Sequence, residues 1–132
     1  MPKYNLSWQT IDASFAEAIL LATGGEGGAP LQEVLLIADA LDGGVYTLSE
    51  VEEALEKLVA AGLVQVIKNK LSLTPAFLHL SESMNEEEIS TEAILNHLKT
   101  ITLTEQSIDE ARTALKKYKL KNYYQQYLEQ YG

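Results

Sequence analysis

The chain has 132 residues, of which 46% are apolar, so it is long enough for one domain with a hydrophobic core. It contains no cysteine, which excludes disulfides and thiolate metal ligands, and its net charge of −9 opposes binding to nucleic acid or to an anionic membrane. No apolar run approaches the roughly 18 residues that a membrane helix needs, and the first ten residues lack the apolar core of a signal peptide. We therefore expect a cytoplasmic protein that makes no membrane contact.

The first predicted helix spans residues 12–23. Its apolar residues recur at helical spacing, and Ser14 and Glu17 have the spacing of a capping box. Asp12 is an alternative cap two residues earlier.

A glycine-rich stretch at residues 24–28 ends this helix. The lysine of a P-loop does not follow these glycines, and a helix rather than a strand precedes them, so the context of a phosphate-binding loop is missing. We interpret the stretch as a flexible link. The second helix then starts with Pro30 in its first turn and stops at Gly43-Gly44.

Residues 47–75 carry the clearest structural signal. Thr47 and Glu50 have the spacing of a capping box, and apolar residues then recur at steps of three and four, as on one face of a helix. Gly62 suits the left-handed residue that closes a helix. After it the apolar period changes to two, which predicts two strands joined by a turn at residues 68–70.

The order of a helix, Gly-Leu-Val, a short hairpin and Leu-Thr-Pro resembles the winged-helix domain, a helix-turn-helix variant found in many bacterial regulators. The resemblance covers about residues 12–80, and the residues that carry it are Asp39–Leu41, Thr47–Val51, Ala54–Leu58, Ala61–Val64 and Leu71–Pro75. It implies a mainly α (α+β) fold, a winged helix with a two-stranded β-hairpin wing and a helical C-terminal extension.

We assign residues 10–82 to the winged-helix domain and residues 83–132 to the extension, a dimerisation or partner-binding element. The polar stretch Ser81–Glu88 is the predicted linker. Helices are expected over Ser90–Leu98, after a cap at Thr104, and on to the end of the chain. The sequence leaves open whether the extension packs on the first domain or stands apart.

The resemblance implies that helix 47–61 enters the major groove of DNA while the wing, residues 63–74, touches the backbone. The DNA contacts would come from exposed polar residues of the helix and of the turn: Ser49, Lys57, Lys68, Asn69 and Lys70. However, the predicted exposed face of the helix carries four carboxylates and one ammonium, and phosphate repels carboxylates. We therefore take DNA-binding transcriptional regulation as the alternative function.

Charge is uneven along the chain. Residues 1–98 carry 15 acidic and 4 basic side chains, whereas residues 99–132 carry 4 acidic and 6 basic ones. Five of the latter form a basic cluster: Arg112, Lys116, Lys117, Lys119 and Lys121. One hypothesis is that this cluster docks on the acidic helix face Glu50–Glu56 of its own or a neighbouring subunit, and binding to nucleic acid is another.

Tyrosines recur at helical spacing near the end of the chain: Tyr118, Tyr123, Tyr124, Tyr127 and Tyr131. Such residues are common in cores and in interfaces, so internal packing and contact with a partner both stay open, and partner contact is the functional interpretation.

Signals of catalysis are absent from the sequence. His79 and His97 lack the spacing of a metal-ligand pair, and no nucleophile, base and orienting group can be named together. We expect no enzyme activity, no cofactor, no metal and no small-molecule substrate. The predicted function is a non-catalytic regulatory or scaffolding module that binds a protein partner or forms a homodimer.

Overall fold

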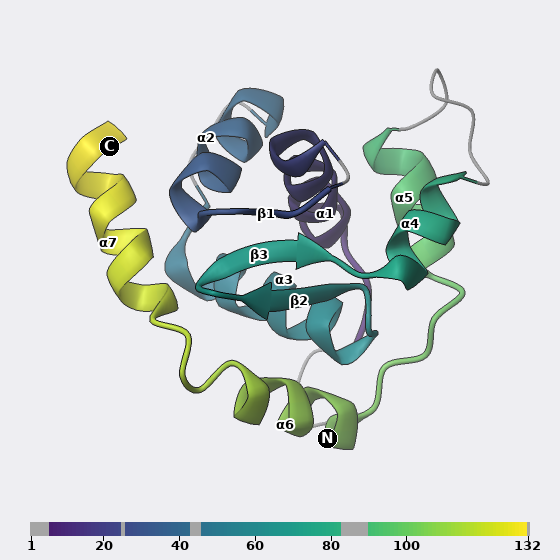
Figure 1. Cartoon of the computed structure of the whole chain (residues 1–132). Coiled ribbons are helices and arrows are strands. Elements are labelled where there is room, and N and C mark those ends of the chain that lie inside the picture. The colour runs from purple at the N-terminus through teal and green to yellow at the C-terminus, as the bar shows by residue number, and fades with distance from the viewer. Residues whose placement is uncertain (1–5, 25, 43–45, 83–89, 132) are drawn as a thin grey trace.

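Helices surround a small three-stranded sheet in this protein (Figure 1). The computed structural model describes residues 6–24, 26–42, 46–82 and 90–131. The elements in chain order are α1 Thr10–Thr23, β1 Gly28–Ala29, α2 Leu31–Asp42, α3 Leu48–Ala60, β2 Val64–Ile67, β3 Lys70–Leu73, α4 Pro75–Glu82, α5 Thr91–Leu98, α6 Glu105–Ala114 and α7 Leu120–Tyr131. The expectation of a mainly helical α+β fold is confirmed.

The predicted β-hairpin is present as β2 and β3. The two strands pair antiparallel, with Val64 opposite Leu73 and Ile67 opposite Lys70. The turn between them consists of Lys68 and Asn69, which have φ angles of 52° and 64°. Two successive left-handed residues are typical of the tight turns whose twist matches that of a hairpin. Lys70, which we predicted in the turn, instead begins β3.

A third strand, β1, was missed by the sequence analysis. Residues 24–28 were predicted as a flexible link, but Gly28–Ala29 pair with β3 and give the sheet the order β1-β3-β2. A Cβ atom on Gly28 would lie 2.8 Å from both Lys70 Cβ and Ser72 Oγ, which is closer than such atoms pack. Glycine therefore permits the pairing, while two residues are too few to show a strand period.

Helix α1 begins earlier than predicted. Its N-cap is Gln9, and the Gln9 N–H donates to the Asp12 carboxylate at 2.8 Å. Ser14, predicted to cap the helix, lies within it and is buried. The capping box of Ser14 and Glu17 was therefore wrong, because the same spacing occurs by chance inside helices.

Helix α3 has the predicted ends. Glu50 N–H donates to Thr47 Oγ1 at 3.2 Å, and Thr47 N–H donates to the Glu50 carboxylate at 2.9 Å, so the capping box is confirmed. Gly62 has a φ of 75°, which confirms the left-handed residue after the helix. Thr74 Oγ1 links this point to α4, since it donates to the Gly62 carbonyl at 2.6 Å and accepts from Phe77 N–H at 3.4 Å.

The three C-terminal helices pack against the three N-terminal ones. Helix α5 contacts α1, α6 contacts α3, and α7 contacts α2, as Figure 1 shows for α6 beneath α3 and α7 beside α2. The apolar side chains that these helices and their connections bury join one continuous cluster with those of α1–α3: Ile94, Leu98, Leu103, Ile108, Tyr118, Tyr124 and Tyr127. The extension therefore packs on the rest of the chain. The predicted boundary falls at residues 82 and 83, at the edge of the described residues, and stays a prediction.

The N-terminal segment also contacts the C-terminal half. Trp8 is buried, and its Nε1–H donates to the Ile101 carbonyl at 2.9 Å. Residues 101–103, for which a strand or an extended connector was expected, belong to no helix or strand, and Leu103 is buried. The Ile101 carbonyl and the buried Leu103 side chain therefore anchor the connector that leads from α5 to α6.

Candidate functional site

The exposed side of α3 is acidic. Ser49, Glu50, Glu52 and Glu53 are exposed along its first half, and Glu56 is partly buried one turn later. Each carboxylate adds to the electrostatic cost of bringing phosphate to this helix. Ser49 is thus the one predicted DNA contact of α3 that is exposed.

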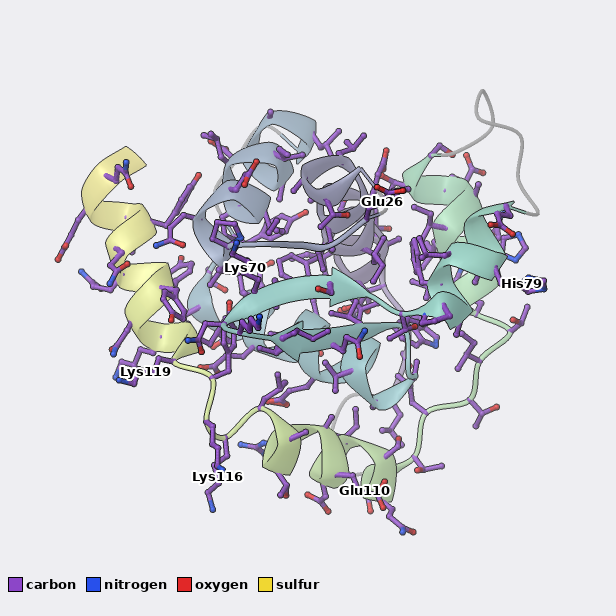
Figure 2. All side chains as sticks on the ribbon, in the orientation of Figure 1. Glu26, Lys70, His79, Glu110, Lys116 and Lys119 are labelled. Carbon is purple, nitrogen blue, oxygen red and sulfur yellow. The ribbon has the colours of Figure 1, made fainter. Side chains whose placement is uncertain are left out.

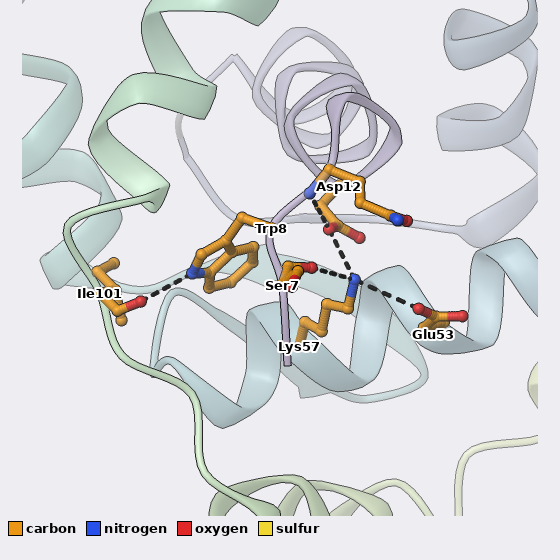
Figure 3. Close-up of polar contacts among 7 residues, drawn as sticks. Ser7, Trp8, Asp12, Glu53, Lys57 and Ile101 are labelled. Atoms are coloured by element: carbon orange, nitrogen blue, oxygen red, sulfur yellow. Dashed lines mark hydrogen bonds and ion pairs between the residues drawn. The ribbon is translucent and has the colours of Figure 1, made fainter. Parts of the chain in front are cut away.

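Lys57 is not on the exposed side of α3, and the prediction of its exposure was wrong. Its side chain is 1% exposed, and Nζ donates to the Ser7 carbonyl at 2.8 Å and to Asp12 Oδ2 at 3.0 Å (Figure 3). Nζ also lies 3.3 Å from Glu53 Oε1. The ammonium group therefore joins the N-terminal segment, the first turn of α1 and α3, and it is not available to a ligand at the surface.

The carboxylate of Asp12 is buried beside Lys57. Burial raises the pKa of Asp12, while the hydrogen bonds from Gln9 N–H and from Lys57 act in the opposite direction. Asp12 Oδ2 takes both hydrogen bonds, and Oδ1 has no partner among the described residues. Because each charge needs the other in this environment, we assign the pair a structural role.

Helix α6 covers one flank of α3. Ile108 and Ala111 on α6 are buried. Arg112 Nε, on the same helix, lies 3.5 Å from Glu56 Oε1. Burial raises the pKa of Glu56, and the charge of Arg112 opposes this. One member of the predicted basic cluster, Arg112, thus meets the acidic face of α3 within the chain.

The hairpin turn presents the remaining predicted DNA contacts. Lys68, Asn69 and Lys70 are all exposed, next to the exposed Ile67 at the end of β2. The sheet therefore ends in two ammonium groups that are free to meet an anionic partner.

Most of the C-terminal tyrosines face inward. Tyr118, Tyr124 and Tyr127 are 7%, 9% and 1% exposed, and the Tyr124 hydroxyl donates to the Tyr46 carbonyl. Tyr123 is partly exposed, with its ring 5.3 Å from that of Tyr118, and the side chain of Tyr131 lies outside the described residues. The predicted partner surface is corrected accordingly, because three of its members hold α7 and the α6–α7 connection to the core.

A cleft of about 370 Å³ opens between α3, α6 and the start of α7. One wall carries Glu52 and Glu56, while the other carries four of the five residues of the predicted basic cluster: Arg112, Lys116, Lys119 and Lys121. Figure 2 shows Lys116 and Lys119 extending outward from the connection between α6 and α7. Tyr118 also lines this cleft. The sequence analysis grouped the basic residues, but only the packing of α6 on α3 creates the cleft.

His79 extends from α4 into solvent (Figure 2), and no three His, Asp or Glu side chains gather to hold a metal ion within the described ranges. Among the helices in those ranges, none combines the length and apolar character that crossing a bilayer requires. Comparisons of the chain with protein-family models, with curated proteins and with solved structures find no match.

Proposed function

We propose that this protein is a non-catalytic winged-helix module that acts by binding a protein with a basic surface, which includes a second copy of itself. The resemblance to winged-helix domains is supported by three helices followed by an antiparallel hairpin with a tight turn.

One observation carries the proposal: what is left exposed on α3 is acidic. Helix α6 packs along one flank, the single lysine of α3 is buried, and Glu50, Glu52 and Glu53 face solvent. A helix that enters the major groove needs exposed donors and few carboxylates. An acidic helix face instead complements a basic protein surface, where it steers association and selects partners.

A second candidate function, DNA binding, is favoured by the hairpin turn. Lys68, Asn69 and Lys70 are exposed and adjacent, as a contact to the phosphate backbone requires. Two lysines neutralise few phosphates, so this binding would be weak and would fall steeply with salt.

A photo-crosslinking residue at position 49 separates the two functions. Ser49 is exposed in the first turn of α3, so the substitution leaves the core and the capping box intact. With cell extract and duplex DNA both present, we expect crosslinks to a protein or to a second copy of the chain. Crosslinks to DNA at position 49, or DNA binding lost in Lys68→Glu/Lys70→Glu, would replace the proposal with the second candidate.

The matched control carries the crosslinker at position 33. Glu33 is also exposed in the first turn of a helix, but that helix is α2. We expect the partner captured from position 49 to be absent from position 33. Equal capture at both positions, together with a monomer in sedimentation experiments, would contradict a partner-binding face on α3.

A further inference from the structure

Helix α6 packs on α3 through one narrow stripe of side chains. Ile108 and Ala111 are its buried residues, and the partly buried Leu115 follows them at helical spacing. In contrast, α1 buries seven residues and α3 buries five. Glu110 extends from the opposite side of α6 into solvent (Figure 2). The docking of α6 on α3 therefore depends on few apolar groups.

The connections on each side of α6 are anchored more firmly than the helix itself. Leu103 precedes α6 and is 6% exposed, and Tyr118 follows it and is 7% exposed. Between these anchors α6 has ten residues, a length at which an isolated helix is marginally stable in water. A segment with few buried apolar contacts opens at a lower free energy than the core. We therefore expect α6 to leave α3 without unfolding of α1–α3.

A single ion pair accompanies the apolar stripe. Arg112 Nε lies 3.5 Å from Glu56 Oε1, and the two side chains are 53% and 22% exposed. A pair with this exposure adds little to the strength of docking. It shows instead which charge suits this flank of α3, since a cation next to the buried stripe meets a carboxylate there.

The contact between α3 and α6 is incompletely filled at one end. The cleft of about 370 Å³ opens there, and apolar Leu55 and Leu115 line it together with acidic Glu52 and Glu56. The surface that α6 covers on α3 therefore continues, with the same combination of apolar and acidic groups, beyond the residues that α6 buries. A helix with larger side chains at this end would fill more of the space than α6 does.

We propose that the flank of α3 beneath α6 binds a basic amphipathic helix of a partner protein, and that α6 covers this site in the free protein. The buried side of α6 defines the partner helix: a large aliphatic side chain as at Ile108, a small one as at Ala111, and a cation as at Arg112. Packing of an amphipathic helix on such a surface is a common mode of recognition. The exposed side of α6 carries Asp109 and Glu110, so a more basic helix would suit the acidic α3 better. As a statement about the partner, this inference rests on the proposed function of α3.

The test uses a fluorescein-labelled synthetic peptide of residues 104–117, whose binding to the full chain is followed by fluorescence anisotropy. Helix α6 competes with the peptide because it belongs to the same chain, so weakening its docking should strengthen binding of the peptide. We expect the chain with Ile108→Ala to bind the peptide at least roughly tenfold more tightly than the original chain. Glu110→Gln, at an exposed position of the same helix, is the matched control and should bind like the original chain. Equal binding by the three chains, or binding by none of them, would overturn the inference.

Hydrogen exchange of the original chain is a second measurement, and it does not require the Ile108→Ala variant to fold. The amides of α6 should exchange at least roughly tenfold faster than those of α1, because α6 opens locally. Exchange of α6 at the rate of α1 would show that α6 does not leave α3 by itself and would overturn the inference. A peptide with Ile108→Asp is the specificity control and should not bind to any of the chains.

These outcomes are distinct from those of crosslinking at position 49. Capture of a partner from position 49 together with failure of the peptide to bind would overturn the helix-binding flank and leave the proposed function. Binding of the peptide together with no captured partner would support the helix-binding flank and contradict the proposed function.

Discussion

The ammonium group of Lys57 lies 3.0 Å from the carboxylate of Asp12, and both side chains are 1% exposed. The two residues are 45 positions apart in the sequence, and their contact joins α3 to the first turn of α1. A pair of this kind orients two helices, because each charge is strongly destabilised without the other.

Lys57→Met tests this relationship. The variant leaves a buried carboxylate without its cation, so we expect the free energy of unfolding to fall by about 3–5 kcal/mol. Urea unfolding followed by the fluorescence of Trp8 measures the change. The double variant Lys57→Met/Asp12→Leu should recover much of the loss, and Glu53→Gln should have little effect because Glu53 is 46% exposed. A small loss in Lys57→Met would contradict the assigned structural role.

Tyr127 tests whether the C-terminal extension is part of the core. It is 1% exposed on α7, which packs against α2, so Tyr127→Ala should destabilise the docked helix by about 3–5 kcal/mol. Hydrogen exchange should report faster exchange in α7 first, since a terminal helix can detach without the rest of the fold. Gln130→Ala, at an exposed position of the same helix, is the control. Unchanged exchange in α7 would contradict this packing.

The residues of the hairpin turn are not the most stable choice for its backbone conformation. Lys68 and Asn69 both have positive φ angles, and Asn-Gly is the pair that suits such a turn best. Lys68→Asn/Asn69→Gly should therefore stabilise the protein by about 1 kcal/mol in thermal or urea unfolding, because it relieves strain at two left-handed residues. Asn69→Val should instead destabilise it by about 1–2 kcal/mol, because a β-branched residue is strained in the left-handed region. A loss of stability in Lys68→Asn/Asn69→Gly, or no loss in Asn69→Val, would contradict this turn geometry.

Because Tyr118 is buried, we expect the protein to lose stability at alkaline pH. Burial raises the pKa of Tyr118 well above its ordinary value of 10, and the charge of Tyr123 adds to this. The unfolded chain therefore releases this proton at a lower pH than the folded protein. Stability linked to Tyr118 is complete below about pH 10 and decreases as the pH rises toward the folded pKa, by roughly 1.4 kcal/mol per pH unit.

Tyr118→Phe removes this linkage. We expect a shallower decline of the free energy of unfolding between pH 10 and 11, with a residual slope because burial also raises the pKa of Tyr124. At pH 7 the variant should be neutral or slightly stabilising, since it removes a hydroxyl without a hydrogen-bond partner. Ultraviolet titration of the folded protein at 295 nm checks the assignment. If Tyr118 ionises together with exposed tyrosines, the predicted burial effect is wrong.

The sequence by itself determined the elements whose signals are local. The capping box of Thr47 and Glu50, the left-handed Gly62 and the change of apolar period from helix to strand each depend on residues within a few positions of one another. Such signals are set by backbone geometry and short-range hydrogen bonds, so they can be recognised without knowing the fold.

Only the tertiary structure decided what these elements present to a partner. Lys57 occupies the same helix as Glu53, and its charge is buried by the approach of Ser7 from the N-terminal segment and of Asp12 from α1. Likewise, β1 exists because Gly28 meets β3, and the basic cleft exists because α6 packs on α3. These contacts join segments far apart in the chain. Their free energy depends on burial and complementary shape, and neither can be read from a single sequence.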